Sequence, residues 1–282
     1  MTVLIAGCGD LGTEVGLRFA ATGRPVLGLR RRAQLLPEAI TGVSRDLTRP
    51  FELPAVEPID TLVVATAADG RDVDTYRRAY LDGLDHVLDA LAAGGHQPRR
   101  ALLVSSTGVY GVEDGSWVDE STPAVPARPT GRILLATEQR LHERLPGAVA
   151  LRLAGIYGPG RTRLIDQIEA GEAVVPDPDV HTNRIHRDDA AAAIVHLMTG
   201  DDDPPALLIG ADDEPALKGE VLRFLATELG RPQPARAAVD RRRGGDKRCR
   251  NTALRATGFT FTYPDFRAGY RAVLAGGGTR HR

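Results

Sequence analysis

The sequence predicts an α/β fold, in which helices cover both faces of a doubly wound parallel sheet and a smaller α/β lobe follows. Three observations predict it. Short apolar runs recur through the first half of the chain, and amphipathic stretches separate them. From about residue 156 the sequence changes to loop-forming segments such as "YGPGR" and "VVPDPDV". We therefore expect a sheet domain over residues 1–155 and a small lobe over 156–282.

The predicted strands are apolar and β-branched, because a strand buried on both faces of a parallel sheet has no polar alternation. They lie at 2–7, 25–30, 60–66, 100–106 and 148–155. After the first of them, Leu11, Val15 and Phe19 recur at helical spacing. Further helices are predicted at 74–93, 131–145, 188–199 and 217–229.

Composition and charge favour a small-molecule partner. Lys and Arg total 36 against 37 for Asp and Glu, so no overall field attracts nucleic acid or an anionic membrane. The first apolar run is too short for a secretory signal, and no run approaches the ~20 residues of a spanning helix. Cys8 and Cys249 lie far apart, which favours a reduced setting. We expect a soluble, cytoplasmic protein with no nucleic-acid, membrane or metal partner.

The segment "GCGDLG" matches G-x-G-x-x-G at Gly7, Gly9 and Gly12, directly after the first strand and at the start of the first helix. Such glycines allow a tight turn, a close approach of the backbone to a pyrophosphate, and close packing of helix on strand. The first amides of the helix then point at the phosphates. The motif predicts a Rossmann-type dinucleotide site; a purely structural turn is the alternative.

The end of the second strand indicates which dinucleotide binds. An acidic residue at this place accepts hydrogen bonds from the ribose of NAD(H). Here the chain has Arg30, followed by Arg31 and Arg32, and guanidinium groups match a 2′-phosphate. NADP(H) is therefore favoured and NAD(H) stays possible; alternatively, these arginines face solvent.

Several segments together resemble the extended and atypical short-chain dehydrogenase/reductase superfamily, in its NAD(P)-dependent epimerase/dehydratase branch. In order they are "GCGDLG", "RDL" (45–47), "SSTGVYG" (105–111), "LRLAGIYGPGR" (151–161), "NRIHRDDAAAAI" (183–194) and "GADDEP" (210–215). The resemblance implies a dinucleotide on the N-terminal sheet, to which 181–198 returns, and a substrate cleft beneath the C-terminal lobe. Helices 74–93 and 131–145 resemble those that pair in dimers of this family, which implies a possible homodimer.

The resemblance also implies site residues. Besides the glycines and arginines above, it assigns cofactor contacts to Asp10, Leu11, Asp46, Leu47, Ala65, Thr66, Ala67, Ser105, Arg152 and Ile156. Ser106 stands at the place of the catalytic hydroxyl, with a strand-end cap as the alternative. Tyr110 is either a packing residue with a bonded hydroxyl or an acid. His186 and Asp189 are expected to be structural.

The family's Tyr-x-x-x-Lys pair is missing. Counting about twenty residues from Tyr110 leads to Thr130, and Leu134 stands four residues further on. Glu138, in "LLATE", supports this frame, because the family pattern there is "LAAE". A threonine hydroxyl donates a hydrogen bond but is no acid near neutral pH, so we expect Thr130 to position a substrate.

Three functions therefore remain open. The first and favoured one is an NADPH-dependent oxidoreductase whose proton comes from water, Tyr110 or a group of the C-terminal lobe. The second is a sugar-nucleotide-type epimerase or dehydratase with a displaced acid/base. The third is a non-catalytic NADP(H)-binding sensor. The basic segment 241–250 is either a solvated loop or a contact for a phosphate-bearing ligand or a partner.

Overall fold

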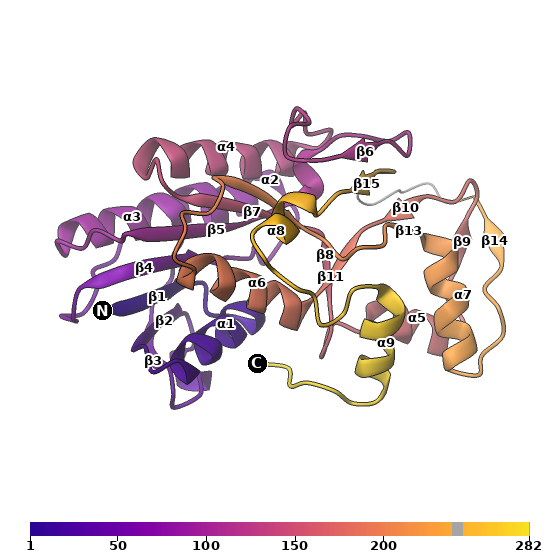
Figure 1. Cartoon of the computed structure of the whole chain (residues 1–282), viewed down its shortest axis with the longest axis horizontal. Helices are drawn as coiled ribbons and strands as arrows, with labels where there is room; N and C mark the ends of the chain where they lie inside the picture. Colours follow the sequence, from indigo (N-terminus) through magenta and orange to yellow (C-terminus); the bar gives the residue numbers. More distant parts are fainter. Residues whose placement is uncertain (239–244, 282) are drawn as a thin grey trace.

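The computed structural model describes residues 1–238 and 245–281 and has a seven-stranded parallel sheet at its centre (Figure 1). This confirms the predicted fold class. Across the sheet the strands are β3 (Thr41–Ser44), β2 (Val26–Arg30), β1 (Thr2–Ala6), β4 (Ile59–Val64), β5 (Arg100–Ser106), β7 (Val149–Leu153) and β12 (Leu207–Gly210). The strand order reverses at β1, where α/β sheets bind ligands beyond the carboxyl ends of their strands.

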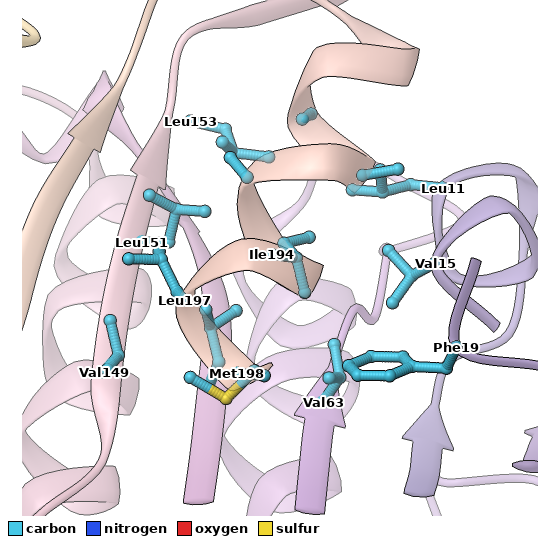
Figure 2. Packing of buried hydrophobic residues seen from close by; sticks show 14 of the residues in the cluster. Leu11, Val15, Phe19, Val63, Val149, Leu151, Leu153, Ile194, Leu197 and Met198 are labelled. Carbon is cyan, nitrogen blue, oxygen red and sulfur yellow. The ribbon is translucent and has the colours of Figure 1, made fainter. Parts of the chain in front are cut away.

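Helices cover both faces of this sheet. On one face, α1 (Asp10–Ala21) packs against α6 (Arg187–Thr199). Figure 2 shows that apolar side chains of α1 and α6 meet over the strands. The residues labelled there, on helices and strands, are Leu11, Val15, Phe19, Val63, Val149, Leu151, Leu153, Ile194, Leu197 and Met198. The other face carries α2 (Val73–Tyr76), the π-helical segment η2 (Arg77–Asp82), α3 (Gly83–Ala93) and α4 (Pro129–Arg144).

The sheet domain includes more of the C-terminal half of the chain than the predicted segment 181–198. Beyond α6, β12 adds the edge strand next to β7. The short helix α8 (Thr252–Ala256) then packs on β12, and Phe259 and Phe261 enter the core beneath α6. The boundary drawn from the sequence is corrected on this point, because β12 is a short apolar run after loop-forming residues and has little sequence signal.

The rest of the chain forms the lobe, with the helices α5 (Arg163–Glu169), α7 (Lys218–Glu228) and α9 (Phe266–Leu274). Outside the central sheet the described residues form four pairs of short strands: β8 (Gly155–Tyr157) with β11 (Arg184–His186), β9 (Val175–Pro176) with β14 (Arg236–Ala237), β10 (His181–Thr182) with β13 (Ala216–Leu217), and β6 (Trp117–Val118) with β15 (Arg248–Cys249). Both cysteines are buried free thiols. Within the described ranges, no helix is long and apolar enough to cross a membrane.

Candidate functional site

The glycine loop between β1 and α1 has one glycine that faces open space and two that do not. Gly7 has φ +86°, and a Cβ on it would lie 2.7 Å from the carbonyl oxygen of Ala65. A Cβ on Gly12 would lie 2.6 Å from the carbonyl oxygen of Gly7. A Cβ on Gly9 would meet nothing within 4 Å. Gly7 and Gly12 are therefore needed for backbone packing, whereas Gly9 leaves room for a ligand to approach the loop.

Two adjoining cavities lie along the carboxyl ends of the strands beside this loop. The arginine cavity, of about 500 Å³, holds nine predicted site residues: Gly7, Gly9, Arg30, Arg31, Asp46, Leu47, Ala65, Thr66 and Ala67. The Ser106 cavity, of about 330 Å³, shares Gly9 and residues 65–67 with it and adds Asp10, Leu11, Ser105, Ser106 and Ile156. The hydroxyl of Thr66 is buried without a hydrogen-bond partner among the described residues. The shape and this open donor fit an extended dinucleotide.

The arginine cavity is strongly basic. Its lining includes Arg30, Arg31, Arg32, Arg45 and Arg78. Arg31 forms a bidentate ion pair with Asp69, at 2.6 and 2.8 Å, and both side chains are exposed. Asp46 accepts hydrogen bonds from the amide and the hydroxyl of Thr48, which lower the pKa of its carboxyl. The described lining of this cavity therefore includes five arginines and only two acidic residues, Asp46 and Asp69, which gives it an excess of positive charge.

The negative charge of Asp10, the first residue of α1, is balanced by three contacts. Its carboxylate accepts from Arg187 at 3.0 Å, from Arg161 at 2.9 Å and from the backbone N–H of His281 at 3.1 Å. The negative charge beside the helix N-terminus is thereby offset, so the first turn of α1 can still attract a phosphate. Arg161 also borders two cavities, the Ser106 cavity and the lobe cavity described below.

A buried polar network lies behind the Ser106 cavity. Glu138 of α4 and Arg152 of β7 form an ion pair, with Arg152 Nη2 at 2.7 Å and Nε at 3.0 Å from the carboxylate oxygens. Ser105 donates its hydroxyl to the same carboxylate. Arg152 also donates to the hydroxyl of Tyr110 at 2.7 Å, and that hydroxyl donates to the backbone oxygen of Asp119 at 2.9 Å. Through its contacts with Ser105 and Arg152, Glu138 connects α4 to the neighbouring strands β5 and β7.

This network changes two sequence-based assignments. Arg152 borders none of the cavities described here, and its guanidinium is engaged with Glu138 and Tyr110, so the structure favours a structural role over the expected cofactor contact. Tyr110 has the bonded hydroxyl of the packing alternative. Burial raises the pKa of Tyr110, which disfavours it as an acid near neutral pH. Gly12 likewise acts through packing rather than at a cavity wall.

Ser106 stands where two cavities meet. Its hydroxyl accepts from the N–H of Gly108 at 3.1 Å and so begins the short 3₁₀ turn η3 (Thr107–Val109), as the cap alternative predicts. Ser106 and Leu134 both border the Ser106 cavity and a further cavity of about 170 Å³, here called the Lys247 cavity. Thr130, in the first turn of α4, borders the Lys247 cavity as well. The two substituted family positions therefore lie beside Ser106.

The lobe cavity, of about 340 Å³, lies between the sheet domain and the lobe. Ile156 connects it to the Ser106 cavity. Its basic side chains are Arg161, Arg163, Arg184 and Lys218, and no acidic side chain is among its described lining residues. None of these residues, nor Lys247, was predicted from the sequence as a site residue. One signal was present: only two of the 36 basic residues are lysines, and each borders a cavity.

His186 and Asp189 have structural contacts. His186 accepts from the N–H of Asp188 at 3.2 Å and caps α6, and burial lowers the pKa of its imidazole to about 4. Asp189 accepts from the N–H groups of Thr262 and Tyr263, each at 2.9 Å. The carboxylate thereby ties α6 to the "TYPDF" segment at 262–266.

Comparisons with known proteins agree with this architecture. The chain is 26% identical over 250 residues to the 2′-dehydrokanamycin reductase of Streptomyces kanamyceticus, covering 82% of this chain and 67% of that protein. A solved structure described as an NAD-dependent epimerase/dehydratase, from Methylobacillus flagellatus, is 36% identical, with a TM-score of 0.81 and 98% of both chains covered.

A more distant structure shares the fold. The UDP-glucuronic acid 4-epimerase of Bacillus cereus, in complex with UDP-glucuronic acid and NAD, is 17% identical, with a TM-score of 0.81 and coverage of 96% of this chain and 97% of that one. The model of the NAD dependent epimerase/dehydratase family matches residues 3–210, which include the glycine loop and, apart from Thr2 at the start of β1, all seven strands of the sheet. By this match over most of its length, the chain belongs to the NAD dependent epimerase/dehydratase family.

Proposed function

We propose that this protein is an NAD(P)-dependent oxidoreductase that interconverts a carbonyl and an alcohol in a small molecule. One observation carries the proposal: the arginine cavity, the Ser106 cavity and the lobe cavity adjoin one another through shared lining residues. A dinucleotide along the first two would present its reactive end near Ser106 and Ile156, where the lobe cavity begins. The similarity to a protein named as a reductase supports the same reaction class.

The residues of this chain would hold and orient the reactants. The amides at the start of α1 would bind the pyrophosphate, and Gly9 would let it approach. When bound, the nicotinamide supplies the hydride chemistry. Ser106 and Thr130 would donate or accept hydrogen bonds at the substrate oxygen. The buried Glu138–Arg152 pair would keep the end of β5 and the helix α4 in register behind them.

The lobe cavity indicates the class of substrate. Three arginines and Lys218 border it, and Arg184 is buried. Guanidinium groups bind carboxylate and phosphate oxygens with paired hydrogen bonds. We therefore propose an anionic substrate, such as a carboxylate or a phosphate ester that also carries a carbonyl or a hydroxyl group.

The reaction class is tested by incubating the purified protein with NADPH or NADH and a panel of anionic ketones, aldehydes and imines, and following cofactor oxidation. Net oxidation with one of them would support the proposal. A cofactor that survives purification and shows no net redox change would instead indicate an epimerase or dehydratase. Binding of NADPH without turnover of any compound would indicate a sensor.

For the cofactor we propose a preference for NADP(H), and Arg30→Asp should reverse it. The carboxylate would repel the 2′-phosphate and could accept hydrogen bonds from the ribose of NAD(H). Hydrogen bonds to charged groups contribute about 1.5–3 kcal/mol, so the ratio of the two Kd values should change by about 10- to 150-fold. Calorimetric Kd values for both dinucleotides measure the ratio.

Arg49→Asp is the matched control for this change. Arg49 is exposed and lies near Asp46, but it does not border the arginine cavity. Its substitution makes the same change in charge and should leave the ratio within about twofold, as expected for a screened surface charge. An unchanged ratio in Arg30→Asp would overturn the assignment.

A further inference from the structure

The Lys247 cavity brings a lysine to the place where the family's acid is missing. Lys247 borders it together with Ser106 and Thr130. Lys247 is buried, and only 3% of the residue is exposed. Charged groups of this cavity that interact with it are Glu113 and Arg128, and the thiol of Cys249 lies close by. Tyr76 and Tyr110 are the phenols on the same cavity wall. This lysine therefore stands beside the substituted positions although it is far from them in sequence.

The backbone around Lys247 is fixed from several sides. Asn183 donates to the carbonyl oxygen of Lys247 at 2.9 Å and accepts from the N–H of Cys249 at 2.7 Å. The next residues form β15, which pairs in parallel with β6. Just before it, the carboxylate of Asp246 accepts from the backbone N–H of His181 at 2.9 Å. The backbone that carries Lys247 is therefore held in position, as the support of a catalytic group has to be.

The choice of residue is also informative. Arginine is the general basic residue of this chain, since only Lys218 and Lys247 among 36 Lys and Arg residues are lysines. A guanidinium group stays protonated in proteins, whereas an ammonium group can give up a proton and take it back. Burial lowers the pKa of Lys247, which makes its ammonium group a stronger acid than a free lysine.

We propose that Lys247 is the proton donor of this site and replaces the missing tyrosine and lysine. The inference rests on the oxidoreductase function proposed above. In the reduction, an N–H bond of the ammonium group breaks and an O–H bond forms at the substrate oxygen. The carbonyl carbon receives the hydride of the reduced dinucleotide, which is oxidised. The neutral amine then regains a proton from water, and Thr130 orients the substrate oxygen through its hydroxyl.

The first test needs no substrate. Because the chain has two lysines, protein labelled with ¹³C-lysine gives two Cε signals, which Lys247→Arg and Lys218→Arg assign. We expect the titration midpoint of Lys247 to lie below the value of about 10.4 for free lysine. It should be lower with NADP⁺ than with NADPH, because the oxidised nicotinamide carries a positive charge. A Lys247 midpoint at the free value, or one that does not depend on the redox state of the cofactor, would overturn the proposal.

The second test uses whichever carbonyl compound of the panel the wild-type protein reduces. Lys247→Arg keeps the positive charge but cannot release a proton. Lys247→Met keeps most of the length of the side chain without the ammonium group. Removing a general acid typically costs about 10²–10⁴ in rate, so both variants should lose at least 100-fold in kcat with an unchanged Kd for the dinucleotide. The fall of kcat at high pH that accompanies deprotonation of Lys247 should also disappear.

The outcomes separate the two proposals. Full turnover in Lys247→Arg would show that the lysine acts only as a charge and would overturn the proton-donor role, while the oxidoreductase function stands. If the wild-type protein reduces nothing, the oxidoreductase function fails, and the NMR titration still shows whether Lys247 responds to the nicotinamide. Thermal unfolding of both variants identifies any loss that is due to misfolding.

Discussion

Replacing Glu138 with glutamine should lower the free energy of unfolding by about 3–5 kcal/mol. The side chain of Glu138 is 4% exposed and that of Arg152 opposite it is 5% exposed, so the substitution leaves a buried cation without its counter-ion. Ser105 and Tyr110 are hydrogen-bonded to the same pair and cannot compensate, because neither carries a negative charge near neutral pH. Urea unfolding followed by circular dichroism measures the loss.

Glu143→Gln is the control for this prediction. Glu143 lies on the same helix and pairs with Arg140, but its side chain is 69% exposed. Surface pairs of this kind contribute about 0–1 kcal/mol, so this variant should be nearly as stable as the wild type. The prediction fails if Glu138→Gln costs less than about 1 kcal/mol. If the folded Glu138→Gln protein also loses dinucleotide affinity, Arg152 has the cofactor role that its contacts argue against.

Substituting Gly9 with valine should weaken dinucleotide binding by about 5- to 150-fold and leave the fold almost unchanged. The valine methyl groups would enter the space over the glycine loop, and forcing extra atoms into a packed site costs about 1–3 kcal/mol. The backbone leaves room for a side chain here, since nothing lies within 4 Å of a Cβ at this position. Gly9 is the N-cap of α1 and makes no side-chain capping bond, so stability should fall by less than about 1 kcal/mol.

Substitutions at two other glycines serve as controls for this result. Gly147, in the turn before β7, has equally open space around its Cβ, and Gly147→Val should affect neither binding nor stability. Gly12→Ala should destabilise the protein, because its Cβ would lie 2.6 Å from a carbonyl oxygen. Calorimetry with NADPH and thermal unfolding separate these effects. Wild-type affinity in Gly9→Val would show that the dinucleotide does not pass over this loop.

The sequence predicts best those parts of the site that depend on neighbours in the chain. The glycine loop follows its strand directly, and Arg30 ends the next strand, so spacing alone indicates that they share one sheet edge. The structure places Thr130 in the first turn of α4, where it borders the Lys247 cavity together with Ser106, and its role at the substrate stays a prediction.

What the sequence does not reveal depends on pairing between distant segments. Lys247 borders the same cavity as Ser106 because β15 pairs with β6, more than a hundred residues away, and Asn183 holds the strand there. Arg152 could equally have pointed at a cofactor, since nothing nearby in the chain indicates that Glu138 would meet it. The basic segment 241–250 lies partly outside the described residues, at 241–244, and only its second half, with Lys247, can be placed in the structure.

From the position of Arg161 we expect a coupling free energy between the proposed dinucleotide and the proposed anionic substrate. One guanidinium is paired with Asp10 and borders both the cofactor side and the lobe cavity. A phosphate of the dinucleotide and an anionic substrate group would both interact with this guanidinium group, so binding of one would change the Kd of the other. Such linkage is reciprocal, and the factor by which one ligand alters the Kd of the other must be equal in both directions. Removing the shared charge, as in Arg161→Leu, should bring that factor close to one.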